Sequence, residues 1–198
     1  QVRALRPDLV VLVGDNFDGR DGPAEEMLPA LRALAAPLGT WAVLGNHDLP
    51  RSGGAVGLPL LESAGIEVLR DGWAQVRPGL VLAGVDDLTR RQRRGPIDGA
   101  MRQALAGRPP GAAVLLSHSP LLAEEAAREG AGLMLSGHTH GGQLWPFGLF
   151  VAQRYPLLAG RYQVGKMAAI VSRGAGLWGP RMRLWQPGEI LRITLRAG

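Results

Sequence analysis

The sequence predicts a single α/β domain spanning residues 1–198, and two observations support this prediction. Short apolar runs rich in β-branched residues, typical of buried strands, alternate with segments that carry helix start and stop signals. The chain also has no internal repeat and no linker-like stretch. Together these features favour one domain of strands and helices, built on mixed sheets.

Each expected element follows from a local pattern. Strands are expected at 8–13, 41–44, 66–69, 73–77, 80–85, 113–116, 133–135, 168–172 and 189–195. Helices are expected at 23–36, 56–64, 97–106 and 121–129. The three strands between residues 66 and 85 follow one another at short spacing, so we expect them to be antiparallel. Pro29 should kink the first of these helices.

Composition excludes several classes of protein. No apolar run reaches the ~18 residues expected of a membrane-spanning helix. The absence of cysteine excludes disulfides, thiolate metal sites and a cysteine nucleophile, and leaves the compartment open. The net charge of +5 comes almost entirely from arginine. Such a charge is typical of binding to nucleic acid or anionic lipid, or it reflects a coding bias toward arginine.

Four of the apolar runs end in small residues followed by Asp, Asn or His. These ends are Gly14-Asp15, Gly45-Asn46-His47-Asp48, Ser117-His118 and Ser136-Gly137-His138-Thr139-His140. All four histidines of the chain lie in these turns. Because ligands of α/β sheets bind at the carboxyl ends of strands, we expect these side chains to converge on one point.

The converging residue types are those of a metal site. A carboxylate, an amide oxygen and several imidazoles suit Mn, Fe, Zn or a related divalent ion. His138 and His140 alternate along a turn, so each can face a different ion. Two ions roughly 3.5–4 Å apart would clamp an in-line phosphoryl displacement and generate a hydroxide at neutral pH.

The motifs GDNFD (14–18), GNHD (45–48), SH (117–118) and GHTH (137–140) resemble those of the calcineurin-like metallophosphoesterase superfamily. The longer stretches GHTHGGQ, VSRGAG (171–176) and PGEILRITL (187–195) resemble its bacterial phosphodiesterase branch, which often carries an N-terminal membrane anchor or export signal. The resemblance implies a sandwich of two mixed β-sheets flanked by helices. It also implies a centre of two divalent metal ions at one edge.

The resemblance also implies a role for each site residue. Asp15 would bridge the two metals, Asn46, His118 and His138 would complete the second metal site, and His140 would bind the first metal. His47 would act beside the leaving group as a cation or general acid. Asp48 would orient His47 and raise the pKa of its imidazole, or would serve only as a turn residue. Arg173 would contact phosphate.

Other residues carry weaker expectations. Asp18 is expected to shape its turn, and Asp86 and Asp87 either face the site or end a strand. The arginine-rich stretch 89–95 is either a loop facing phosphate or anionic lipid, or a solvated loop. Trp145, Phe147 and Phe150 line a substrate pocket or a membrane-facing rim, or pack in the core.

One departure from the family pattern concerns the first metal. The superfamily's first motif, Asp-x-His, does not occur in this sequence. The opening residues 1–15 resemble the end of a family helix that leads into the second core strand, so we expect the first strand and its motif to be missing from the N-terminus. The alternative is a divergent protein with one metal. The missing segment leaves a cytoplasmic location and a membrane-associated or exported one both open.

Two function classes follow. The favoured one is a metal-dependent hydrolase in which an activated hydroxide attacks a phosphoester or phosphodiester. Its partners would be a small phosphoester or a phospholipid-like substrate and an anionic membrane surface, and no specific nucleic-acid or protein partner is predicted. The alternative is a catalytically impaired or non-catalytic metal-binding domain that binds an anionic partner. The pair His47 and Asp48 favours the hydrolase, and the missing first motif favours the alternative.

Overall fold

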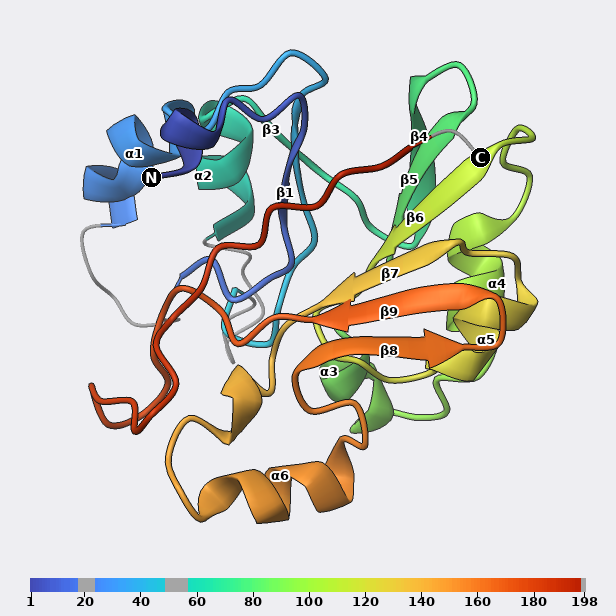
Figure 1. Cartoon of the computed structure of the whole chain (residues 1–198). Helices are drawn as coiled ribbons and strands as arrows, with labels where there is room; N and C mark the ends of the chain where they lie inside the picture. The colour runs from blue at the N-terminus through green and yellow to red at the C-terminus, as the bar shows by residue number, and fades with distance from the viewer. Residues whose placement is uncertain (18–23, 49–56, 197–198) are drawn as a thin grey trace.

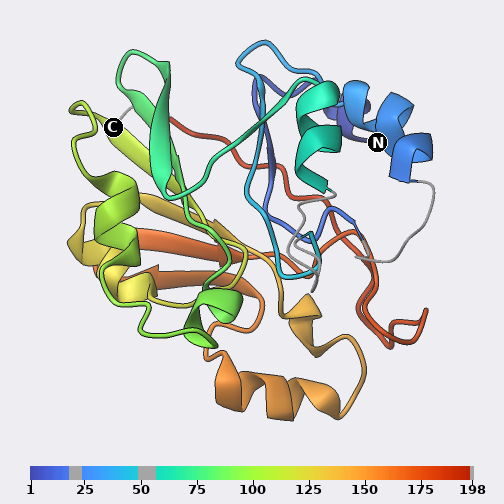
Figure 2. The same ribbon diagram turned by 180° about the vertical axis from the view of Figure 1, so that it is seen from behind.

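The computed structural model describes residues 1–17, 24–48 and 57–196, and shows an α/β sandwich of two sheets with helices outside them (Figures 1 and 2). The smaller sheet holds β1 (Val10–Leu12), β2 (Thr40–Ala42) and β3 (Ile66–Val68), all parallel. The larger sheet has the order β4-β5-β6-β7-β9-β8. Its strands are β4 (Gly72–Arg77), β5 (Leu80–Gly84), β6 (Ala112–Leu116), β7 (Leu133–Ser136), β8 (Gly160–Val164) and β9 (Met167–Val171).

The larger sheet is mixed, as the sequence predicts. The pairs β5–β6, β6–β7 and β7–β9 are parallel, and the outer pairs β4–β5 and β8–β9 are antiparallel. The α-helices are α1 (Leu28–Arg32), α2 (Gly57–Ser63), α3 (Leu88–Gln92), α4 (Ala100–Leu105), α5 (Ala123–Arg128) and α6 (Phe147–Arg154). The described residues also form the short 3₁₀ helices η1 (Val2–Leu5), η2 (Ala24–Met27) and η3 (His140–Gly142).

Three apolar layers hold these elements together. Side chains of β2, β5, β6 and β7 fill the space between the sheets. Helices α4 and α5 cover the outer face of the larger sheet, and α1 and α2 cover that of the smaller one. The sheets approach closely at Gly84, where a Cβ atom would lie 2.5 Å from Leu69 Cβ. A side chain at this position would therefore force the sheets apart.

Several elements differ from the sequence-based expectation. The expected antiparallel trio is wrong for its first member, because β3 pairs in parallel with β2 in the smaller sheet. The expected helix 23–36 is shorter, and consists of η2 followed by α1, which ends at Arg32. The sequence predicts a kink at Pro29, but Pro29 stands in the first turn of α1, where its missing N–H costs no hydrogen bond. The sequence did not predict α3, α6 or β8.

The expected strand 189–195 is not formed. Residues 187–196 belong to no strand, and apolar side chains such as Leu191 and Ile193 stay exposed. The physical reason is the lack of a partner, since among the described residues no strand is hydrogen-bonded to this segment.

Strand β1 lies at an edge of the smaller sheet, because within the described ranges it pairs only with β2. No helix in the described part of the chain is long and apolar enough to cross a bilayer.

Candidate metal centre

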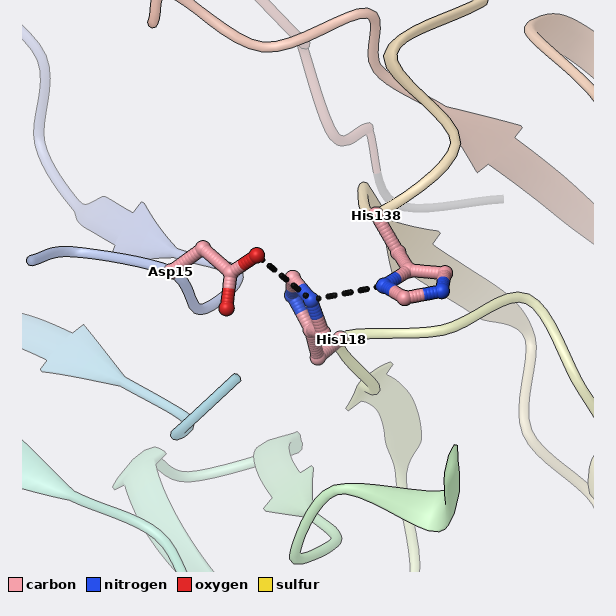
Figure 3. Close-up of side chains that lie close together, drawn as sticks. All are labelled: Asp15, His118 and His138. Atoms are coloured by element: carbon pink, nitrogen blue, oxygen red, sulfur yellow. Dashed lines mark hydrogen bonds and ion pairs between the residues drawn. The ribbon is translucent and has the colours of Figure 1, made fainter. Parts of the chain in front are cut away.

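Four strand ends converge at one edge of the sandwich, as the sequence predicts. Asp15 follows β1, Asn46 follows β2, His118 follows β6 and His138 follows β7. The Nε2 atom of His118 lies at their centre, 3.2 Å from Asp15 Oδ2 and 3.2 Å from Asn46 Oδ1. His138 Nδ1 lies 3.0 Å from the same atom (Figure 3).

The buried ring of His118 is fixed in one orientation. Its Nδ1 lies 2.8 Å from the carbonyl oxygen of Val13. Because a carbonyl oxygen only accepts hydrogen bonds, Nδ1 must carry the proton in this contact. Burial lowers the pKa of His118, but the hydrogen bond and charge of Asp15 outweigh burial and raise it, so without a cation Nε2 carries a proton toward Asp15. A divalent ion would displace that proton, and Nε2 would then present its lone pair to the centre of the site. This is the arrangement in which metal-binding histidines are usually held.

His138 has a comparable partner on its outer side. Its Nε2 lies 2.9 Å from the hydroxyl oxygen of Tyr155, and the two rings meet edge to face with their centroids 4.9 Å apart. When Nε2–H donates to this oxygen, Nδ1 is left free toward His118 and Asp15. Burial, reinforced by the charge of His118, lowers the pKa of His138 to about 4. The ring is therefore neutral at physiological pH and available as a ligand.

The carboxylate of Asp15 is held in its charged form. Burial alone would raise its pKa, but the hydrogen bond and charge of His118 outweigh burial and lower it. The backbone N–H of His47 also donates to Asp15 Oδ1 over 2.9 Å. The result is a negative oxygen, Oδ2, facing the imidazoles.

The backbone at the site is strained. Asp15, His138 and His140 have φ angles of 52°, 68° and 51°, in the left-handed region that residues with a side chain rarely adopt. Each such residue costs on the order of 1–3 kcal/mol, and these conformations cluster at functional sites. Three of the expected metal ligands are therefore held in place at a cost to stability.

Two glycines make room for this arrangement. A Cβ atom on Gly14 would lie 2.6 Å from His118 Nδ1, and one on Gly45 would lie 2.2 Å from Asp15 Oδ1. Any side chain at either position would displace a donor of the site. Gly14 and Gly45 therefore allow the turns that follow β1 and β2 to approach each other closely.

Asp48 links the same two turns. Its buried carboxylate accepts hydrogen bonds from the Gly45 N–H at 2.8 Å, the Phe17 N–H at 3.0 Å and Asn16 Nδ2 at 3.1 Å. These contacts fit the turn role that the sequence left open for Asp48. His47 is half-buried beside Asp15.

His140 stands apart from the central cluster. Its Nδ1 atom is buried and has no hydrogen-bond partner among the described residues, and its pKa is lowered to about 4 by burial and by the nearby Arg183. Nη1 of Arg183 donates to the His140 carbonyl oxygen over 3.2 Å. A buried nitrogen with a free lone pair is costly unless something binds it. His140 therefore offers a donor beside the cluster.

The donor set fits a divalent ion. Donor atoms of Asp15, His118 and His138 all lie within 4.8 Å of one another, and the amide oxygen of Asn46 adds a fourth donor beside His118. Mixed nitrogen and oxygen donors suit Mn, Fe or Zn. A cation bound among these donors would take the place of the proton that His118 Nε2 shares with Asp15.

Sequence comparison agrees with this geometry. The family model described as calcineurin-like phosphoesterase matches residues 1–142. The chain belongs to this family. A zebrafish (Danio rerio) protein named "Transmembrane protein with metallophosphoesterase domain" is 36% identical over 206 residues, covering 98% of this chain and 47% of its own length. An uncharacterized metallophosphoesterase of Aquifex aeolicus is 34% identical, covering 96% of this chain and 74% of its own length.

Two further comparisons bear on this assignment. The uncharacterized metallophosphoesterase YkuE of Bacillus subtilis is 33% identical, covering 99% of this chain and 70% of its own length. A solved crystal structure superposes with a TM-score of 0.53 at 14% identity, over 85% of this chain and 80% of that one, which supports the fold alone. The chain spans about half the length of the first relatives, at 47%. The descriptions of the family and of these relatives name phosphoesterases and metallophosphoesterases.

The remaining residues predicted for this metallophosphoesterase lie outside the central cluster. Arg173 lies in the turn after β9, and its Nη2 pairs with Glu189 Oε2 at 2.6 Å. Both residues line a cavity of about 310 Å³. Asp86 pairs with Arg70, and Asp87 caps α3, so each makes a structural contact. Asp18 lies outside the described residues.

The sequence did not reveal two residues of the site. Tyr155 lies in no motif and reaches His138 only because α6 and the turn after it bring the ring back to the metal edge. Arg183 contacts His140 through the backbone carbonyl, which no sequence pattern reports. Asn16 could have been noticed as a second polar residue directly after Asp15, but its hydrogen bond to Asp48 depends on the approach of two turns.

Proposed function

We propose that this chain hydrolyses a phosphate ester or phosphodiester at the centre formed by Asp15, Asn46, His118 and His138. The observation that carries the proposal is the convergence of these donors on His118 Nε2 from four separate strand ends. Two of the donors are imidazoles whose outer nitrogens already have partners. The nitrogens of His118 and His138 that face the centre can therefore serve as ligands.

The fixed groups prepare the site for an anionic substrate. Divalent ions bound there would act as Lewis acids toward the phosphate and supply a nucleophile at neutral pH. Asp15 contributes a fixed negative charge because His118 and the His47 N–H keep it ionised. Asn46 contributes a neutral oxygen, and Val13 and Tyr155 keep the two imidazoles from rotating.

We assign the leaving-group side of the reaction to His47. Its backbone is tied to Asp15, which places the residue beside the donors while its side chain is only half-buried. An imidazole in this place can donate a proton to the departing oxygen or stabilise charge on the phosphate. Asp48 supports this role indirectly, because it ties the His47 turn to the turn that carries Asp15.

We assign His140 to a second ion next to the first. The supporting observation is its buried Nδ1, which has no hydrogen-bond partner in the part of the chain that the structure describes. We further propose that the substrate is a small phosphoester or a phospholipid-like molecule, and that the protein works at or near a membrane. The proposed membrane location is supported by two relatives that are named transmembrane proteins.

The test joins metal content to turnover. Purified chain is reconstituted with Mn²⁺ or Zn²⁺, freed of excess ion and analysed for bound metal, then assayed on bis-p-nitrophenyl phosphate and p-nitrophenyl phosphate. We expect stoichiometric metal and turnover of at least one substrate, and loss of both in His118→Asn. Stoichiometric metal with no turnover of either ester would instead support a non-catalytic binding domain.

A further inference from the structure

The edge that carries the metal donors also carries a group of exposed aromatic and aliphatic side chains. We call this group the apolar rim, and define it as Trp145, Phe147, Leu149, Phe150, Trp178 and Trp185. The exposed fractions reach 68% for Trp145 and Leu149 and 77% for Trp185. Large apolar residues gathered on one exposed surface mark an interaction site.

The apolar rim belongs to two segments that are tied together. Helix α6 contributes Phe147, Leu149 and Phe150, and none of its eight residues is buried. The segment 177–185 contributes Trp178 and Trp185. In Figures 1 and 2, α6 lies at the bottom of the molecule, and this segment projects to the side at a higher level.

Gln143 makes the link between them, three residues after His140. Its Nε2 donates to the Trp178 carbonyl at 2.6 Å, and its Oε1 accepts from the Trp178 N–H at 2.8 Å. Its backbone carbonyl accepts from the Leu184 N–H at 3.2 Å. On the other side, Gly142 packs so tightly on Gly148 of α6 that a Cβ would lie 2.3 Å from its Cα. The rim is therefore anchored to the turn that carries the metal donors.

The sequence around the rim carries one sign of charge. Between Glu129 and Glu189 it has six cations and no acidic residue. Lys166 precedes β9, at the end of the sheet opposite the metal donors, and Arg173 pairs with Glu189. The segments that carry the rim themselves contribute Arg154, Arg181 and Arg183. Arg154 ends α6 and hydrogen-bonds Gln92 of α3, which brings the exposed Arg93 and Arg94 to the same side.

We propose that the apolar rim docks this protein on the surface of an anionic lipid bilayer. Exposed Phe and Leu on a protruding helix, with exposed Trp beside it and arginines but no acidic residue in the same segments, are the features of an interfacial membrane anchor. The arginines supply attraction to anionic headgroups, and the aromatic rings enter the headgroup boundary. Docking through this rim would hold the metal edge against the membrane. The proposal does not depend on hydrolysis.

The test is vesicle sedimentation of the whole chain. Vesicles of phosphatidylcholine alone are compared with vesicles in which part of it is replaced by phosphatidylglycerol. We expect binding to the anionic vesicles and weaker binding as salt is raised. Replacing Leu149 and Phe150 by Ser should weaken binding on the order of tenfold or more. Arg181→Gln should weaken it about fivefold.

Matched controls distinguish binding through the apolar rim from nonspecific adsorption to vesicles. Leu195→Ser removes an exposed leucine at the end of the chain remote from α6, and Arg77→Gln removes an exposed arginine of β4. Both controls should bind vesicles like the parent chain, and all variants should melt like it. Absence of binding, equal binding to neutral vesicles, or equal losses in the controls would overturn the proposal. A dimer in solution that the Leu149 and Phe150 changes dissolve, with no vesicle binding, would assign the rim to a second copy of the chain.

Discussion

The hydroxyl oxygen of Tyr155 lies 2.9 Å from Nε2 of His138, on the side of the ring opposite the metal donors. This contact gives Nε2 a partner and leaves Nδ1, 3.0 Å from His118 Nε2, for the centre of the site. Tyr155 is therefore a positioning residue for His138.

We expect Tyr155→Phe to weaken metal binding about 10–100-fold, the usual cost of losing the partner behind a metal-binding histidine. Competition with a fluorescent chelator would measure the affinity directly. Tyr162→Phe is the matched control, because the Tyr162 hydroxyl bonds the backbone of Leu158 and Ala159. It should lower the melting temperature without changing metal affinity. Equal metal affinities in the two variants would remove Tyr155 from the site.

His47→Asn should lower turnover while bound metal stays unchanged. The structure links His47 to the centre through its backbone N–H, which the substitution keeps. Loss of a general acid or of a cation beside the phosphate lowers the rate about 10²–10⁴-fold. Metal analysis and turnover are measured on the same preparation. If metal content falls in proportion to activity, His47 is a ligand and the assignment is wrong.

The convergence of the site could be predicted because it follows from strand order. Asp15, Asn46, His118 and His138 each come directly after an apolar run, and parallel strands end at a common edge. The sequence could not place Tyr155 or Arg183, since their contacts depend on how α6 and the segment after β9 fold back over the metal edge. The spacing of apolar residues predicts which residues form a helix or strand. It carries little information on where a later segment of the chain folds back over an earlier one.

The same limit explains the misplaced strands. The apolar run 66–69 could pair with β4 or with β2 as far as its sequence shows. Only the packing of the two sheets places β3 in the smaller one. The run 189–195 has the alternation of a strand, but a strand also needs a neighbour. Helix α6 was not predicted because its exposed aromatic residues give no clear division into a buried and a polar face.

The ion pair between Arg173 and Glu189 should make stability depend on pH in the acid range. Although burial opposes it, the hydrogen bonds and charge of Arg173 lower the pKa of Glu189 from its ordinary value of 4.5. A carboxylate with a lowered pKa in the folded state stabilises the fold above its unfolded pKa. That stabilisation is lost as pH falls through the lower, folded value.

Glu189→Gln should therefore melt at a lower temperature than the parent near neutral pH, and the difference should shrink as pH falls below about 4.5. Melting curves across this range test the prediction. The exposed Glu67 provides the matched control, Glu67→Gln. A constant difference between the Glu189 variant and the parent at all pH values would show that the ion pair adds no pH-dependent stability.

Gly45→Ala should destroy metal binding by steric displacement alone. The new methyl group would lie 2.2 Å from Asp15 Oδ1, well inside contact distance, and 2.4 Å from the Asp15 backbone nitrogen. The carboxylate must then move away from His118, and the His47 N–H loses its acceptor. Overpacking of a dense site costs about 1–3 kcal/mol, so a lower melting temperature should accompany the loss of metal.

Gly95→Ala is the control, because nothing lies within 4 Å of its added Cβ and its backbone needs no positive φ. Metal titration and melting of both variants measure the effect, and full metal affinity in the Gly45 variant would contradict a role for Asp15 as ligand.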